Sequence, residues 1–258
     1  MIYKANESDR PKLNEYLKLN APLNLFFIGD IENNGFDCEY QKVWIDEDDQ
    51  GIHGCLLKYR DSLCLMSYEN IVYQSFVNNL MQNETIKVIN GEESLIKLYD
   101  FPDYPKHEDC AFAVMREPNY GIDTSLVSLL TYDNLPELIQ LENECFPGFD
   151  NKLENVQNSY LTHQGRFFGI FQDHKLVSAA SSTAECSNLA MAVGVCTKKE
   201  YRARHYAKMC IAKLSNTLLE EGKTPCLFFN DPYATKIYHS LGYQDIGRWT
   251  MLKKSNNS

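Results

Sequence analysis

The pattern of apolar and polar positions is clearest near the end of the chain. Residues 189–196 form a short apolar run between polar residues, which predicts a buried strand. A helix is predicted from about Arg202, because four apolar residues recur there at helical spacing: Ala207, Ile211, Leu214 and Leu218. Gly222 is a natural stop for this helix, and residues 226–229 form a second apolar run. The pattern predicts a strand–loop–helix–strand unit with parallel strands and a right-handed connection.

The remainder of the second half predicts further short strands and helices around this unit. Strands are predicted at 126–130, 166–171, 175–184 and 246–252. A helix capped by Asp133 or Asn134, with Pro136 in its first turn, is predicted to end near 145–148. Two more helices are predicted at 151–163 and 234–241. Together these elements form a mixed α/β domain.

The first half predicts a similar mixture of elements. Helices are predicted at 9–19, 23–31, 71–81 and 92–99, and strands at 42–45, 51–59, 63–67, 85–89 and 110–115. The turn-rich segment 117–121 predicts a domain junction. We therefore expect two domains, residues 1–120 and residues 121–258.

Composition narrows the class of protein. The chain has 258 residues, 44% of them hydrophobic, and a mean hydropathy of -0.40, which fits a soluble globular protein with well-filled cores. No apolar run approaches the ~20 residues of a membrane span. The N-terminus has no apolar signal region, so we expect a cytoplasmic protein.

Cysteines and acidic residues exclude further classes. Nine cysteines are scattered without a C-x-x-C pair, so neither a disulfide framework nor a zinc site is expected. The acidic cluster at 46–49 lacks the remaining ligands of an EF-hand, and we expect no metal. A sequence pI near 5.1 argues against nucleic acid as the main partner.

Candidate chemistry gathers in the strand-to-helix turn at 197–207. The turn carries four cationic residues on a chain whose formal net charge is -10: Lys198, Lys199, Arg202 and Arg204. The first amides of a helix have no intrahelical partner and suit a phosphate or pyrophosphate. The alternative is that these cations are merely solvated, although cations at a helix N-terminus oppose the helix dipole.

This turn, with the sequence EYRARHYA, resembles the acyl-CoA pyrophosphate loop of the GNAT acetyltransferase superfamily, whose pattern is Q/R-x-x-G-x-G/A. A second motif of the family follows one helix and one strand later, in the expected order. The matching residues are Val195, Thr197, Glu200, Tyr201, Arg202, Tyr206, Ala207, Pro232, Ala234, Ile237, Tyr238, Gly242 and Tyr243. The resemblance covers roughly the last half of the chain.

Two residues depart from the family's pattern. The glycine of the loop is His205 here, and a side chain at this position affects how closely the backbone approaches the pyrophosphate. The asparagine before the proline is Asp231, and Asn230 is the candidate to replace its amide. Both changes bear on how the cofactor binds.

The resemblance implies the GNAT fold, a mixed α/β sheet, with a catalytic C-terminal domain. The first half repeats the order of elements without the loop, like the degenerate copy of a tandem GNAT protein. Acetyl-CoA is the implied co-substrate, and its implied contacts are Val193, Gly194, Val195, Thr197, Arg202, Ala203, Arg204, His205, Tyr206, Ala207, Lys208, Asn230 and Ala234. Tyr238 is the implied acid that protonates the leaving thiolate. Glu185 is a candidate base, with a surface position in a hairpin as the alternative.

The expected function is transfer of an acetyl group to the amine of a small molecule or amino acid by direct attack. One alternative, motivated by His205 and Asp231, is an inactive acyl-CoA-binding regulatory module. Another is acetylation of a protein N-terminus or lysine. We expect a monomer or homodimer.

Overall fold

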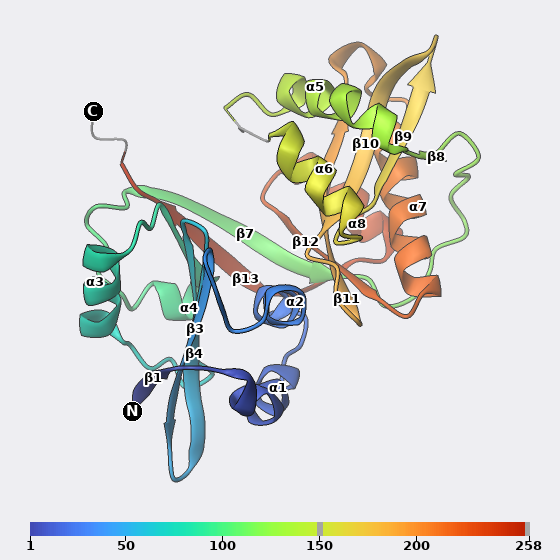
Figure 1. The fold of residues 1–258 in the computed structure, drawn as a ribbon. Coiled ribbons are helices and arrows are strands. Elements are labelled where there is room, and N and C mark those ends of the chain that lie inside the picture. Colours follow the sequence, from blue (N-terminus) through green and yellow to red (C-terminus); the bar gives the residue numbers. More distant parts are fainter. Residues whose placement is uncertain (149–151, 256–258) are drawn as a thin grey trace. The chain divides into compact units, whose positions relative to one another are not determined.

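The structure, a computed structural model, describes residues 1–148 and 152–255. The chain divides into two compact units (Figure 1). Unit 1 comprises Met1–Phe112, Phe228–Asn230 and Ile246–Ser258, and unit 2 comprises Ala113–Leu227 and Asp231–Asp245. The chain passes between the units four times: within β7 (Lys106–Val114), β12 (Thr224–Phe229) and β13 (Gln244–Lys253), and after Asn230.

This division differs from the predicted domains 1–120 and 121–258. The first crossing comes at Phe112, before the turn-rich segment, and the last strand of the chain joins unit 1. Turn residues mark where a chain bends, but they do not show which sheet a later strand joins. The partner of β13 is β6, more than a hundred residues earlier, which no local pattern indicates.

Unit 1 is a twisted sheet with helices packed on it. Its strands run in the order β1-β3-β4-β5-β6-β13-β7, and β2 pairs with β3. The strands not yet given are β1 (Ile2–Lys4), β2 (Asp37–Cys38), β3 (Gln41–Asp48), β4 (Gly51–Tyr59), β5 (Ser62–Met66) and β6 (Val88–Glu92). The helices are α1 (Arg10–Lys18), α2 (Leu25–Asn34), α3 (Gln74–Asn83) and α4 (Glu93–Ile96). The sequence did not predict β1 and β2, which are only three and two residues long.

Unit 2 is a sheet in the order β12-β11-β10-β9-β8, completed by four helices. The strands are β8 (Ser128–Leu129), β9 (Phe167–Gln172), β10 (Lys175–Thr183) and β11 (Leu189–Thr197), besides the first part of β12. The helices are α5 (Leu135–Cys145), α6 (Leu153–Leu161), α7 (Tyr206–Glu220) and α8 (Pro232–Leu241). The helix predicted at 151–163 begins outside the described residues, and α6 covers its remainder.

Side chains of the central strands point to both faces of this sheet. Leu176 and Ala179 join an apolar cluster with Leu138 of α5. Ser178, between them, lies 3.8 Å from the thiol of Cys210 on α7. Helices α5 and α7 therefore cover opposite faces. β9, β10 and β11 are antiparallel and β11 is parallel to β12, so the expected mixed α/β fold and the parallel strand pair are confirmed.

Among the described residues, no helix combines the length and the apolar character needed to cross a bilayer.

Candidate active site

The central strand of unit 2 contains a β-bulge. Two residues of β11, Gly194 and Val195, oppose a single residue of β10, Ala180. Gly194 has a φ of +62°, a left-handed conformation that glycine adopts at little cost and that one class of bulge requires. Next to the bulge, Val193 is 37% exposed although β11 is otherwise largely buried. The bulge therefore presents backbone to a ligand in the middle of a sheet.

β11 also separates from its neighbour at this point. The parallel ladder with β12 runs from Leu189 opposite Thr224 to Met191 opposite Cys226, whereas the pairing of β11 with β10 continues to Thr197. Backbone groups that have lost a ladder partner need another one. The opening therefore suits an extended, hydrogen-bonding arm of a ligand.

A basic loop, residues 198–205, connects β11 to α7. Its residues Lys199–Tyr201 form one 3-10 turn, after which Ala203 and His205 have φ of +62° and +63°. Left-handed backbone costs a non-glycine residue roughly 1–2 kcal/mol and cannot continue a right-handed helix. The predicted start of the helix at Arg202 is therefore wrong, and α7 begins at Tyr206.

His205 shows why a glycine is usual at its position. Its backbone has the left-handed conformation that glycine adopts most readily, and histidine is among the few other residues that tolerate it. The imidazole is exposed rather than packed into the protein. The departure from the family's pattern therefore keeps the backbone path and adds a side chain at the surface.

The N-terminus of α7 carries no side-chain cap. The first-turn amides of Tyr206, Ala207 and Lys208 therefore remain directed along the positive end of the helix dipole. Arg202 is exposed and its Nε donates to the carbonyl oxygen of Thr197 at 3.2 Å. The guanidinium of Arg204, also exposed, lies 5.3 Å from the ring centre of Tyr201. Amides and cations together suit a diphosphate.

Asp231 has a clear local role at the start of α8. Its Oδ1 accepts hydrogen bonds from the amides of Tyr233 and Ala234, both at 2.8 Å, which makes it the N-cap. Aspartate and asparagine cap helices about equally well, so this departure preserves the helix start. The amide of Ala234 is engaged by this cap. Asn230 is exposed and belongs to the short segment of unit 1, so its contact with the cofactor stays a prediction.

Tyr238 lies on α8 and is 7% exposed. Its ring packs edge to face against Tyr243, with ring centres 5.8 Å apart. Burial, with smaller contributions from Asp231 and Cys196, raises the pKa of Tyr238 to about 12. The phenol is therefore a proton donor throughout the neutral range, as a general acid must be.

Glu185, the candidate base, lies in an ion-pair network beyond the end of β10. Arg166 donates to both carboxylate oxygens at 2.8 and 2.7 Å, Ser182 Oγ donates at 2.5 Å, and Lys223 Nζ lies at 3.1 Å. Burial acts to raise the pKa of Glu185, but these hydrogen bonds outweigh it and hold the pKa below its usual value. The neighbouring Cys186 bonds to Leu189, at the far end of β11 from the bulge. This geometry favours a structural role, and the role as base stays an untested prediction.

A buried carboxylate that the sequence did not suggest lies at the bulge. Glu142 on α5 is 4% exposed, and a methyl group added at Gly194 would come within 2.4 Å of its Oε1. The same methyl group would lie 3.5 Å from the hydroxyl oxygen of Ser181. A signal was present, because Leu138, Leu141 and Cys145 share the inward face of the helix with Glu142. A carboxylate within an otherwise apolar stripe is unusual.

Two thiols lie between α5 and the end of β11. The hydrogen bond from Cys196, helped by the nearby charge of Arg202, lowers the pKa of Cys145 to about 7. The pKa of Cys196 is raised by the same bond and by burial. Cys145 is therefore the more reactive member of the pair.

Comparison with known proteins agrees with this geometry. A family model described as GNAT acetyltransferase matches residues 133–252. Over these residues the chain is similar to GNAT acetyltransferases. No curated protein matches the sequence.

Solved GNAT structures share the fold over nearly the whole chain. A GCN5-related N-acetyltransferase from Sphaerobacter thermophilus is 11% identical, with a TM-score of 0.66 over 98% of this chain and 95% of that one. A tandem GNAT protein from the clavulanic acid biosynthesis pathway is 12% identical, with a TM-score of 0.57 over 98% and 97%. A GCN5-related N-acetyltransferase-like protein from Streptococcus suis is 15% identical, with a TM-score of 0.56 over 90% and 98%. The expected GNAT fold is thereby confirmed.

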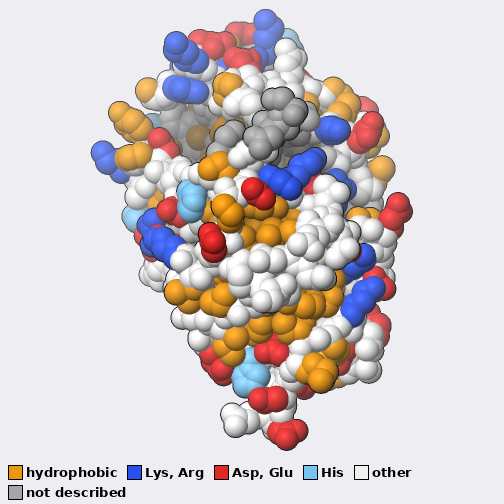
Figure 2. Space-filling view, turned by 90° about the vertical axis from the view of Figure 1, so that its left-hand side faces the viewer, with side chains coloured by type: hydrophobic (Ala, Val, Ile, Leu, Met, Phe, Trp, Pro, Cys, Tyr) orange, Lys and Arg blue, Asp and Glu red, His pale blue; other side chains and the backbone are white. Residues whose placement is uncertain are grey.

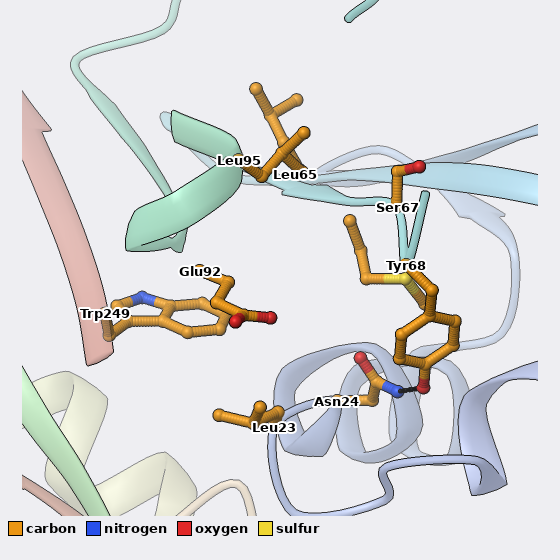
Figure 3. Close-up of a pocket in the computed structure, with 9 residues that line it drawn as sticks. Leu23, Asn24, Leu65, Ser67, Tyr68, Glu92, Leu95 and Trp249 are labelled. Atoms are coloured by element: carbon orange, nitrogen blue, oxygen red, sulfur yellow. Dashed lines mark hydrogen bonds between the residues drawn. The ribbon is translucent and has the colours of Figure 1, made fainter. Parts of the chain in front are cut away.

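Unit 1 has its own pocket, at the carboxyl ends of the parallel strands β5 and β6 (Figure 3). The Glu92 carboxylate points into it beside the indole of Trp249, and Asn24 Nδ2 donates to the Tyr68 hydroxyl at 2.6 Å (Figure 3). Its lining includes Glu92 but neither lysine nor arginine. A diphosphate would meet repulsion here, so the pocket does not duplicate the basic loop of unit 2.

In the part of the chain that the structure describes, no group of three or more histidine, cysteine, aspartate or glutamate residues is arranged to hold a metal ion.

Proposed function

We propose that this protein transfers an acetyl group from acetyl-CoA to the amine of a small molecule or amino acid. The observation that carries the proposal is the bulge at Gly194, which lies where β11 parts from β12 and a few residues before the uncapped N-terminus of α7. One end of this arrangement suits a diphosphate, and the other offers unpaired backbone to a pantetheine arm. The match of residues 133–252 to the GNAT acetyltransferase family model supports acetyl transfer in general.

The residues of the basic loop have distinct tasks in this proposal. The amides of residues 206–208 bind the diphosphate with the help of Arg202 and Arg204, while Arg202 also fixes the end of β11 through the Thr197 carbonyl. Backbone N–H groups near Gly194 polarise the thioester carbonyl. The amine attacks this carbonyl directly, and Tyr238 protonates the departing thiolate.

Turnover and binding together test the proposal. Acetyl-CoA should release free thiol in the presence of a panel of small amines, and calorimetric titration should show binding of acetyl-CoA. The double variant Arg202→Ala with Arg204→Ala should raise the KM for acetyl-CoA by roughly tenfold or more, because two phosphate contacts are lost. The double variant Arg60→Ala with Arg116→Ala removes the same charge elsewhere and serves as control. No heat and no thiol release would refute the proposal.

The same measurements separate the alternatives. Binding of acetyl-CoA without thiol release on any amine would favour an inactive regulatory module. Turnover only on peptides would favour a protein acetyltransferase.

The cysteines and the surface charges bear on the cellular compartment and on the type of acceptor. All nine cysteines are free, which supports a reducing compartment such as the cytoplasm. Acidic and basic side chains are interspersed on the face drawn in Figure 2, which supports a small-molecule acceptor over a nucleic acid. We propose a monomer or homodimer.

A further inference from the structure

The position of Glu142 is costly for a carboxylate. The leucines on the same face of α5, Leu138 and Leu141, are completely buried, and Glu142 is 4% exposed. Transfer of an ionised carboxylate out of water costs several kcal/mol even after the protein relaxes around it. Buried carboxylates in such places are often functional. A leucine would be the ordinary choice at this point of the helix.

Glu142 reaches the feature that defines the proposed active site. Gly194 has a left-handed φ, and even a methyl group there would approach Glu142 Oε1 to 2.4 Å. The bulge residue must therefore be glycine both for its backbone and for the carboxylate beside it. The carboxylate lies against the backbone that, in the proposed reaction, faces the thioester.

Ser181 provides a second, independent observation. Its side chain is 2% exposed, and among the described residues its hydroxyl oxygen has no hydrogen-bond partner. A buried hydroxyl without a partner costs roughly 1–3 kcal/mol, so it is commonly satisfied by something outside the protein chain. Its oxygen and Glu142 Oε1 both lie near the position that a Cβ atom would take at residue 194. Carboxylate and hydroxyl oxygens side by side accept hydrogen bonds, and an ammonium group offers three.

We infer that Glu142 and Ser181 bind the ammonium group of the acceptor beside Gly194, and that Glu142 accepts its proton. This inference rests on the proposed acetyl transfer and names its catalytic base. One proton passes from the ammonium to the Glu142 carboxylate, which frees the nitrogen lone pair. The C–N bond forms as the C–S bond breaks, Tyr238 protonates the departing thiolate, and the second proton of the nitrogen restores the Tyr238 phenol. Glu142 then returns its proton to solvent.

The variant Glu142→Gln tests the proton transfer. We expect kcat/KM for the amine to fall by roughly 10²–10⁴-fold, the usual loss for a general base. The Kd for acetyl-CoA should stay within about twofold, because the diphosphate contacts are untouched. Glu117→Gln, which alters an exposed carboxylate of the same unit, should leave both values unchanged.

A pH profile distinguishes a base from a merely structural carboxylate. In the wild type, kcat/KM should level off once Glu142 is ionised; in Glu142→Gln it should keep rising towards the pKa of the free ammonium. The other ionisable groups at this place are the Cys196 thiol on β11, the Cys145 thiol on α5 and the Arg202 guanidinium in the basic loop. The pKa of Cys145 is lowered to about 7, so Cys145→Ala serves as the control. It should keep the wild-type profile if Glu142 is the base.

Ser181→Ala separates binding from stability. The KM for the amine should rise by roughly tenfold through the loss of one hydrogen bond to a charged group. The melting temperature should stay equal or increase, because an unsatisfied hydroxyl is removed. If wild type acetylates amines but Glu142→Gln keeps its kcat/KM and pH profile, the inference is overturned and the acetyltransferase proposal stands. If wild type neither binds acetyl-CoA nor releases thiol, both fail.

Discussion

Tyr238 is suited to donate a proton because its surroundings hold the proton in place. Burial raises its pKa to about 12, so the phenol is protonated at every pH at which the protein is assayed. A raised pKa in the folded state also has a consequence for stability. The contribution of this phenol is complete below its unfolded pKa of 10.0 and is lost as the pH rises to about 12.

Tyr238→Phe should lower turnover by at least about tenfold, since the thiolate then leaves without an acid. The affinity for CoA should stay nearly unchanged, and steady-state thiol release with calorimetry checks both values. Tyr233→Phe makes the same change at a residue of α8 that is 79% exposed, and should have no effect. Undiminished turnover in Tyr238→Phe would remove Tyr238 from the mechanism.

Glu185→Gln should reduce stability far more than activity. The substitution removes the buried one of two bidentate partners of Arg166, held at 2.8 and 2.7 Å, and leaves it paired with Glu221. We expect a loss of roughly 2–4 kcal/mol. Because the pKa of Glu185 is lowered, the pair stabilises the protein above the usual glutamate range. This gain is lost as the pH falls through the lowered pKa.

Urea unfolding of wild type and Glu185→Gln at neutral and acidic pH measures this difference, which should shrink in acid. Turnover per folded molecule should stay within about threefold of wild type. A loss of turnover of a hundredfold in folded protein would instead support Glu185 as the base.

At the scale of elements, the connection between β11 and α7 is an unusual way to begin a helix. Two non-glycine residues at left-handed φ, Ala203 and His205, lie on either side of Arg204 between the 3-10 turn and α7. The cost of this backbone is of the order of 1 kcal/mol for each residue. Conformations of this kind persist where the surroundings or a ligand require them.

His205→Gly should therefore relieve backbone strain and strengthen the binding of acetyl-CoA. The gain in stability should be small, about 0.5 kcal/mol, because glycine also gains freedom in the unfolded chain. The KM for acetyl-CoA should fall severalfold once the imidazole no longer borders the diphosphate. His163→Gly is a matched control, because His163 also has a left-handed φ, of 56°, at the end of α6. It should change the melting temperature similarly and leave the KM unchanged; equal effects of both variants on the KM would exclude a role of His205 in binding.

The extent to which the sequence predicts these elements depends on how local their causes are. The stripe of α7 and the stop at Gly222 were predictable because side-chain spacing alone determines them. The true start of α7 was not predictable, because the pattern of apolar and polar residues does not reveal the left-handed φ of Ala203 and His205. Glu142 was missed for another reason. Its place in an apolar stripe is a local signal, but that signal does not show what the carboxylate contacts. Gly194 lies about fifty residues later, and only the fold brings the two together.

At the scale of the whole molecule, the order of the strands along the chain differs from their order in the sheet. β13 comes last in sequence yet pairs with β6, with Trp249 opposite Glu92 and Lys253 opposite Val88. Trp249 also packs against Phe26, Phe112 and Phe228, three rings from distant parts of the chain. The core of unit 1 is therefore incomplete until the last residues are present.

A fragment of residues 1–120, the domain that the sequence predicts, should consequently fail to fold. It lacks β13, so the inner edges of β6 and β7 are left unpaired, and it lacks Trp249, whose loss from a core typically costs 3–5 kcal/mol. We expect weak near-ultraviolet circular dichroism and no cooperative urea transition for this fragment. Trp249→Phe in the full chain, which keeps the strand and most of the ring packing, should still unfold cooperatively. A fragment 1–120 that unfolds as sharply as the full chain would show that β13 is dispensable and that unit 1 is the autonomous domain the sequence suggests.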